Sequence, residues 1–282
     1  MEILLKERYY IKDLKPPSKI INALNKSTKS LRIASIQSED AWNANLLTPF
    51  DDWICIKENI DRASGYEPLC MLKTHRFASQ MDGTSPMIKS MWGTRLWSFS
   101  NHRLFDLGGI THLITSEPLN NPRLKLITRD SFTMPHFHGG WWRNKNLYLY
   151  ENKHAFPRAF LSIDNKEMKI KPINYRTISA NQRQLIFRTN QAGTVIISES
   201  FHSGWVAVEK NEEIQLEPFL DTFISFNLPA GEHNIILDFK PQSLRIGLIF
   251  TIAGLLLISF IFLFQKVRTF KNNKMNKTEI TI

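Results

Sequence analysis

Hydrophobic positions along the chain follow two different patterns, and the change between them comes near residue 146. Before it, segments with helical spacing are mixed with short apolar runs. Residues 16–27 predict a helix, with Ile20, Ile21 and Leu24 on one face, and 31–36 predicts a strand. Residues 69–79 and 86–99 also predict helices, and 109–115 predicts a buried strand after a Gly-Gly break. We therefore expect a mixed α/β part over 1–145.

From residue 146 onward, short strands recur about every 8–12 residues, with turn residues such as Pro229-Ala230-Gly231 between them. This spacing is typical of a sandwich or a barrel, and we expect a β-sandwich over 146–241. A hairpin turn is predicted over 209–212, because Asn211 tolerates a left-handed conformation. The fold class expected for these two parts together is α+β.

One segment, 246–264, is apolar on all sides. Its nineteen residues carry no charge, and fourteen of them are Leu, Ile or Phe. As a helix it is about 28 Å long, close to the thickness of a hydrocarbon core. Those fourteen side chains favour insertion by roughly 4 to 8 kcal/mol. A buried core helix is the alternative, but cores rarely need a helix that is apolar all round. We predict one transmembrane helix over 246–264 and a tail over 265–282.

The charge is distributed unevenly along the chain. Lys and Arg number 36 and Asp and Glu 26, a formal charge of +10. The tail has a charge of +4, which leaves +6 scattered over the rest of the chain. The tail's one acid is Glu279, and its five cations are Lys266, Arg268, Lys271, Lys274 and Lys277. Without a basic run, nucleic acid is not an expected partner. Because positive tails stay in the cytoplasm, we expect an extracytoplasmic bulk and a cytoplasmic C-terminus.

The first residues contain no apolar stretch of the length found in signal peptides. Export of the bulk would then depend on other membrane helices. We expect the chain to be the C-terminal portion of a larger polytopic protein, or a split version of one. A tail-anchored protein with a cytoplasmic bulk is the alternative, and the basic tail argues against it.

The run 136–142 is the most unusual local sequence, His-Phe-His-Gly-Gly-Trp-Trp. His136 and His138 share a face if the run is extended, but no third ligand follows at a suitable spacing, so no metal is expected. Trp141 and Trp142 offer rigid apolar area for stacking on a sugar. Packing between the two parts is the alternative role for both tryptophans.

A second set of candidate substrate-binding residues consists of Arg62, Tyr66 and Glu67 in a turn-rich segment, and Arg158 at the start of a strand. Arg158 suits a bidentate contact with the phosphate of a lipid-linked sugar, or a pairing with a neighbouring carboxylate. The alternative for the segment that contains Arg62 is a purely structural turn, which Gly65 permits.

No catalytic residues or cofactors are predicted. The chain has no Gly-x-Ser-x-Gly elbow and no phosphate-cradling glycine loop. Glu199, Ser200 and His202 are too close in sequence to form a triad within one strand. Two cysteines, Cys55 and Cys70, permit at most one bridge, and the sequence leaves their pairing open.

Four segments, in order, resemble the bacterial YfhO family of membrane proteins. Residues 60–69 are similar to its Gly-Tyr-x-Pro-Leu segment, 105–115 to a turn followed by a strand, and 151–160 to a Glu-Asn…Pro-Arg-Ala segment. The match is best over 201–250, and its matching residues are Gly204, Trp205, Pro229, Ala230, Gly231, His233 and Pro241. The chain departs from the family at His202-Ser203, where an aromatic followed by Pro is usual, and at Lys210-Asn211, where Asp-Gly is usual.

The resemblance implies a relation to C-type glycosyltransferases, in which many membrane helices precede an extracytoplasmic domain and a last helix. Such enzymes carry the catalytic carboxylate in the first outer loop and bind lipid-linked sugar with the membrane core. We therefore expect an accessory or acceptor-facing domain, or a split subunit, in a bacterial cytoplasmic membrane. Its expected partners are the lipid bilayer, other membrane helices, and an envelope glycan or lipid-linked sugar. The alternatives are a membrane-tethered glycan-binding module without enzyme activity and a gene remnant.

Overall fold

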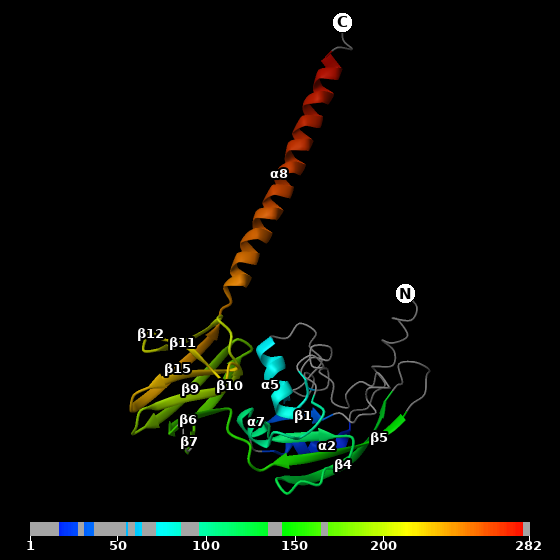
Figure 1. Cartoon of the computed structure of the whole chain (residues 1–282). Helices are drawn as coiled ribbons and strands as arrows, with labels where there is room; N and C mark the ends of the chain where they lie inside the picture. The colour runs from blue at the N-terminus through cyan, green and yellow to red at the C-terminus, as the bar shows by residue number, and fades with distance from the viewer. Residues whose placement is uncertain are drawn as a thin grey trace.

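The computed structural model describes residues 17–27, 31–36, 55, 60–63, 72–85, 96–134, 143–164 and 169–278. Within them the chain forms three five-stranded sheets and a long C-terminal helix, α8 (Gln242–Thr278) (Figure 1). The first sheet belongs to a mixed α/β part, and the other two sheets are antiparallel. The expected fold class, α+β with one C-terminal helix suited to a membrane, is confirmed.

The first sheet has the strand order β2-β1-β3-β5-β4. In this sheet β1 pairs in parallel with β2 and β3, whereas β5 is antiparallel to both β3 and β4. Parallel strands are normally covered on both faces, and β1 and β3 are accordingly almost entirely buried. The strand bounds are β1 (Arg32–Ile36), β2 (Asp61–Arg62), β3 (His112–Thr115), β4 (Leu124–Met134) and β5 (Arg143–Asn152).

Helices cover the two faces of this sheet. On one face, α2 (Ser18–Asn25) buries Ile20, Ile21 and Leu24 in a cluster with Ile33 of β1. Ala34, the next residue of β1, points to the other face and packs with residues of α5 (Leu72–Asp82) and α7 (His102–Leu107). The helices predicted over 16–27 and 69–79 are thus confirmed. Of the helix predicted over 86–99, residues 86–95 lie outside the described residues, and 96–99 are not helical.

The second and third sheets pack face to face as a β-sandwich. Their strand orders are β13-β14-β10-β6-β7 and β12-β11-β15-β9-β8. Val195 and Ile197 of β10 meet Leu185 of β9 and Ile235 of β15 in the core between them. The strands are β6 (Ala159–Asp164), β7 (Lys169–Pro172), β8 (Asn174–Ser179), β9 (Gln182–Thr189), β10 (Gly193–Ser200), β11 (Trp205–Glu209), β12 (Glu212–Ile214), β13 (Glu217–Phe219), β14 (Phe223–Leu228) and β15 (Gly231–Phe239).

The predicted hairpin turn joins β11 to β12. Lys210 and Asn211 both have positive φ, 50° and 69°, as a tight two-residue hairpin turn requires. Glu209 and Glu212 are paired across the turn. The prediction made from Asn211 is therefore confirmed.

The second sheet is also covered on its outer face, by the α/β part. Phe160 and Ile196 point away from the sandwich core and pack in one cluster with Phe77 of α5 and Phe105 of α7. The rings of Phe77 and Phe223 lie 4.8 Å apart in an edge-to-face contact. The two parts therefore share a continuous apolar core and are not joined by a linker alone.

The first sheet continues past the expected boundary at residue 146. Strand β5 runs from Arg143 to Asn152 and pairs with β3 and β4, and the first strand of the sandwich begins at Ala159. The alternation over 146–150 correctly indicated a strand. It carried no information about the sheet to which the strand belongs, because its partners lie elsewhere in the sequence.

Helix α8 leaves the sandwich at the end of β15 and projects away from the body (Figure 1). Its segment Gln242–Gln265 is long and apolar enough to cross a membrane, and none of that apolar window is buried within the chain. The predicted span 246–264 lies inside this segment. At about 1.5 Å per residue, the 24 residues extend about 36 Å, slightly more than a hydrocarbon core of about 30 Å.

Candidate functional site

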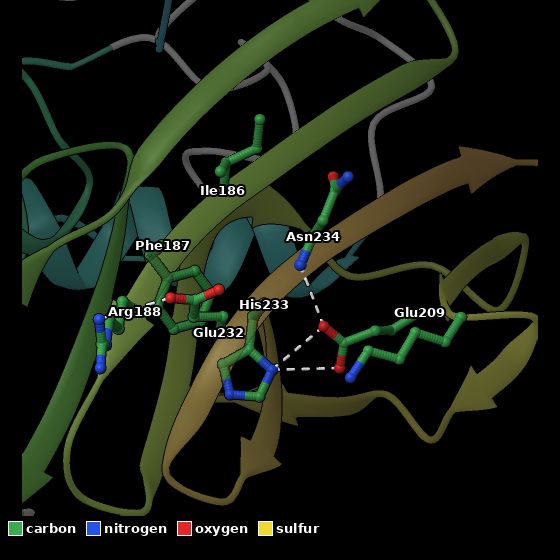
Figure 2. Close-up of a pocket in the computed structure, with 8 residues that line it drawn as sticks. Ile186, Phe187, Arg188, Glu209, Glu232, His233 and Asn234 are labelled. Atoms are coloured by element: carbon green, nitrogen blue, oxygen red, sulfur yellow. Dashed lines mark hydrogen bonds and ion pairs between the residues drawn. The ribbon is translucent and has the colours of Figure 1, made fainter.

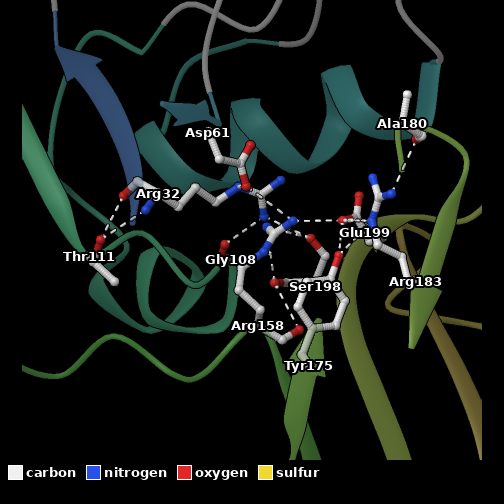
Figure 3. Close-up of polar contacts among 10 residues, drawn as sticks. All are labelled: Arg32, Asp61, Gly108, Thr111, Arg158, Tyr175, Ala180, Arg183, Ser198 and Glu199. Atoms are coloured by element: carbon white, nitrogen blue, oxygen red, sulfur yellow. Dashed lines mark hydrogen bonds and ion pairs between the residues drawn. The ribbon is translucent and has the colours of Figure 1, made fainter. Parts of the chain in front are cut away.

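Six polar side chains from all three sheets meet where the α/β part packs on the sandwich (Figure 3). We call them the arginine cluster: Arg32 (β1), Asp61 (β2), Arg158 (just before β6), Tyr175 (β8), Arg183 (β9) and Glu199 (β10). Arg32 is the first residue of β1 and Glu199 lies near the end of β10, two strands whose interiors are buried. Burial of the strands therefore brings the charged ends together and requires that they find partners.

Arg158 is paired with two carboxylates. Its Nη2 lies 2.7 Å from Glu199 Oε1 and 3.1 Å from Asp61 Oδ2. Its Nη1 donates to the carbonyl oxygen of Ser198 at 3.1 Å and lies 3.4 Å from the Ser198 hydroxyl. Only 7% of the side chain is exposed. Of the two roles considered for Arg158, the structure shows the carboxylate pairing.

Arg32 approaches the same carbonyl from the first sheet. Its Nη1 donates to Ser198 O at 2.7 Å and to Gly108 O at 2.9 Å, and its Nε lies 3.5 Å from Asp61 Oδ2. Gly108 belongs to the Gly-Gly turn before β3, where Gly109 has φ +64°. A Cβ on Gly109 would lie 3.2 Å from Ser198 Oγ, so this turn fits closely against the cluster.

Tyr175 and Arg183 complete the cluster on the sandwich side. The Tyr175 hydroxyl donates to Glu199 Oε1 at 2.5 Å and accepts from Arg183 Nε at 2.9 Å. Arg183 Nη1 donates to Ser179 O at 2.6 Å, and its guanidinium lies 5.8 Å from the centre of the Trp205 ring. Trp205 in turn packs on Phe239 at the end of β15, with 5.1 Å between ring centres. The cluster is therefore connected to the strand that leads into α8.

The charges of the cluster determine the protonation of its members. Burial opposes ionisation of Glu199, but Arg158, Arg32 and the Tyr175 hydroxyl outweigh it and lower the pKa of Glu199. Burial and the Glu199 charge raise the pKa of Tyr175 to about 12. Burial lowers the pKa of Arg32, as does Arg158. For Arg158, burial is outweighed by Glu199 and Asp61, and its pKa is raised.

This arrangement suits a structural role, holding the two parts of the fold together, better than it suits proton transfer. A general acid or base works best with a pKa near the working pH, whereas Glu199 stays ionised and Tyr175 stays neutral. Three arginines face two carboxylates, so the cluster has a formal charge of +1. Its chemistry is that of a buried clamp that fixes the α/β part on the sandwich.

A second polar group lies at the other end of the third sheet, beside a hollow of ≈ 520 Å³ (Figure 2). His233 Nδ1 is 3.1 and 3.2 Å from the two oxygens of Glu209, and Nε2 is 3.1 Å from the carbonyl oxygen of Pro229. Glu209 and Pro229 both offer acceptor oxygens to the ring. Glu209 Oε1 also accepts the Asn234 N–H at 3.0 Å. His233 thus ties the β14–β15 turn to the end of β11.

The predicted substrate-binding residues are only partly placed. Arg62 follows Asp61 in β2, and its segment reaches Arg158 through the Asp61 carboxylate. Four others lie outside the described residues: Tyr66, Glu67, Trp141 and Trp142. His136 and His138 lie outside them as well. Among the residues that the structure describes, no three His, Cys, Asp or Glu side chains are grouped so as to hold a metal.

Sequence reasoning missed most of the arginine cluster. Arg32, Asp61, Tyr175 and Arg183 were not recognised, and Glu199 was considered only for a triad within its own strand. Glu199 instead joins Arg158, which is 41 residues away in sequence. The available signal was a charge at or near the end of an apolar strand, as at Arg32 and Glu199, because such a charge needs a partner when the strand is buried.

No protein-family model and no curated protein matches the chain. Two solved structures share limited similarity with it: cryo-EM structures of the arabinofuranosyltransferase AftD from Mycobacteria, one of them a mutant. Their identities to this chain are 10% and 9%, and each TM-score is 0.24. Each match covers 51% of this chain and 13% of the AftD chain. A score of this size carries neither a fold nor an activity over to this chain.

Proposed function

We propose that this chain is an extracytoplasmic accessory or acceptor-facing domain, with its membrane helix, of a YfhO-like membrane glycosyltransferase. It would act on cell-envelope glycans with lipid-linked sugar donors, either within one polytopic chain or as a split subunit. Membrane helices outside these residues would supply the catalytic core. The basic tail would lie in the cytoplasm and the sheets outside it.

The observation that carries this proposal is where the four YfhO-like segments lie in the fold. Residues 60–69 supply Asp61 to the arginine cluster, 105–115 supply the Gly108 carbonyl, and 151–160 supply Arg158. These segments are far apart in sequence, yet they meet at one place. Their meeting supports a common structural role for these segments.

The fourth segment, 201–250, forms the joint between the sandwich and α8. Lys240 N–H donates to Gly204 O at 2.7 Å, and a Cβ on Gly204 would lie 3.0 Å from the Cα of Pro241. Trp205 packs on Phe239, and His233 ties the preceding turn. The resemblance therefore covers the residues that connect the clamp to the membrane helix.

Helix α8 has a surface suited to other membrane helices. No atom lies within 4 Å of a Cβ added to Gly247 or Gly254. The two glycines are seven residues apart, so they lie on one face of the helix. Small residues on one face let helix backbones approach closely in a membrane. This face supports docking onto the helices of a polytopic partner.

Candidate acceptor contacts remain those predicted from the sequence. We propose that Trp141 and Trp142 stack on sugar and that Tyr66 and Glu67 bind polar groups of the substrate. Arg62 would lie beside them. Arg158 would position this segment through Asp61 and not touch substrate, because Nη1 and Nη2 are both engaged within the cluster.

The test is photo-crosslinking from α8 in native membranes, followed by co-purification. We expect the full chain to capture a polytopic partner, and Gly254→Leu to reduce capture at least fivefold. Ala253→Leu is the matched control, because it adds the same side chain about 100° around the helix and should leave capture unchanged. Absence of any membrane partner, together with glycan binding by the purified chain, would instead support a tethered glycan-binding module.

A further inference from the structure

The base of α8 leaves very little distance between the sandwich and the membrane. Strand β15 ends at Phe239 and α8 begins at Gln242. The charge-free run starts at Ile246, so Phe239 lies at most about 16 Å along the chain from the hydrocarbon boundary. The headgroup layer accounts for about 5–7 Å of that distance. The end of the sandwich therefore lies at the headgroup surface.

The joint also restrains the sandwich from swinging away. Lys240 N–H donates to Gly204 O, and Leu244 N–H donates to Pro241 O at 3.2 Å. The Phe239 ring is held between Trp205 and His202, with ring centres 5.1 and 5.4 Å away. These contacts hold Phe239 and Lys240 on the sandwich, and α8 begins directly after Pro241, so the same end of the domain faces the bilayer.

Two other elements lie beside this joint. The β8–β9 turn is level with Phe239, because Asn181 O accepts the Phe239 N–H at 2.8 Å. The first turn of α5 reaches the β10–β11 loop, where Lys73 Nζ lies 5.7 Å from the centre of the Phe201 ring. We call the surface they form with the base of α8 the membrane-facing end: Leu72, Lys73, Ile178, Lys240 and Arg245.

The composition of this surface matches an anionic bilayer surface. Leu72 and Ile178 are large apolar side chains with 62% and 45% of their surface exposed. Lys73, Lys240 and Arg245 are exposed cations at the same end. Cations beside a membrane span are attracted to anionic lipid headgroups. Lys240 also pairs with Asp238 at 2.8 Å, which leaves its other ammonium hydrogens for a phosphate.

We propose that the membrane-facing end is seated on anionic phospholipid headgroups, with Ile178 and Leu72 in the interface and the three cations on lipid phosphates. This goes beyond the glycosyltransferase proposal and requires only that α8 crosses a bilayer. The contact fixes the height of the arginine cluster above the membrane, because Arg183, Trp205 and Phe239 link the cluster to the joint.

The third sheet offers a matched pair of positions for the test. Ile178 on β8 and Ile186 on β9 point to solvent with similar exposure, 45% and 47%. Ile178 lies at the joint, whereas Ile186 pairs with Asn234, about four residues or 13 Å further along the strands. The full chain is reconstituted in nanodiscs with a photoreactive benzoylphenylalanine in place of either residue. Lipid adducts are then counted by mass spectrometry.

In nanodiscs containing phosphatidylglycerol, we expect at least fivefold more lipid adduct from position 178 than from position 186. Equal adducts at both positions, or adducts to protein at 178, would overturn the seating. The charge contribution is tested by combining Lys73→Gln, Lys240→Gln and Arg245→Gln. We expect this triple variant to lose at least threefold of the preference for phosphatidylglycerol over phosphatidylcholine.

Lys210→Gln, at the far end of the third sheet, is the control for the triple variant and should keep the full preference. An unchanged preference in the triple variant would overturn the anionic headgroup assignment. The outcome is independent of the glycosyltransferase proposal, because it needs neither a sugar nor a partner chain.

Discussion

Arg32 and Arg158 donate to the same carbonyl oxygen, that of Ser198, at 2.7 and 3.1 Å, although they belong to different parts of the fold. Two like charges meet there because Glu199 and Asp61 stand beside them. The carboxylates offset the repulsion and the burial of the guanidinium groups. The interface between the α/β part and the sandwich therefore depends on a balance of charges and not only on apolar packing.

Removal of one carboxylate should unbalance this interface. In Glu199→Gln the size is kept, but three arginines are left with Asp61, whose side chain is 43% exposed. Breaking a buried ion pair by losing one partner costs about 3–5 kcal/mol. We expect a decrease of that order in the free energy of unfolding, measured by urea denaturation of the chain in nanodiscs.

Glu232→Gln is the control for this experiment. Glu232 pairs with Arg188 at 3.5 Å, but 77% of its side chain is exposed. Exposed pairs contribute little, so the change should stay within about 0.5 kcal/mol. A similar loss in both variants would show that the carboxylate of Glu199 has no special role.

Acid should weaken the clamp in a defined direction. The pKa of Glu199 in the folded chain lies below its value in the unfolded chain. Its contribution to stability is therefore complete above the unfolded value of about 4.3, and is lost as the pH falls through the folded value. We expect the stability of Glu199→Gln to depend less on pH than the wild type below about pH 4.3. Parallel curves for the two proteins would contradict the lowered pKa.

Raising the pH should show the raised pKa of Tyr175. Its pKa of about 12 lies above the value near 10 of an unfolded tyrosine, so the folded state holds its proton longer. The contribution of this phenol to stability is complete below pH 10 and is lost as the pH rises toward 12. We expect a step near pH 12 in the tyrosinate absorbance of the folded chain, due to Tyr175. Tyr175→Phe should remove that step.

Local features of the fold could be predicted from the sequence, and distant pairings could not. The helix α2 is predictable from Ile20, Ile21 and Leu24, because their spacing follows the helical period. The charge-free run inside α8 is recognisable for the same reason. In contrast, Arg32 and Ser198 are separated by 166 residues, and no local spacing relates them. General chemistry predicts that Arg158 can pair with a carboxylate. Only the structure identifies the partners as Glu199 and Asp61.

Gly204 should be essential to the joint between the sandwich and α8. A Cβ there would lie 3.0 Å from the Cα of Pro241 and 3.1 Å from the Phe239 ring, so the backbone or the ring would have to shift by a few tenths of an ångström. Overpacking of this kind costs about 1–3 kcal/mol. We expect Gly204→Ala to lower the free energy of unfolding by that amount and to speed hydrogen exchange at Lys240 N–H, which bonds to Gly204 O. Gly254→Ala is the control, because its Cβ would meet nothing within 4 Å and α8 keeps its geometry. If exchange at Lys240 is unchanged in Gly204→Ala, the joint is flexible, and neither the clamp nor the membrane-facing end is held at a fixed height.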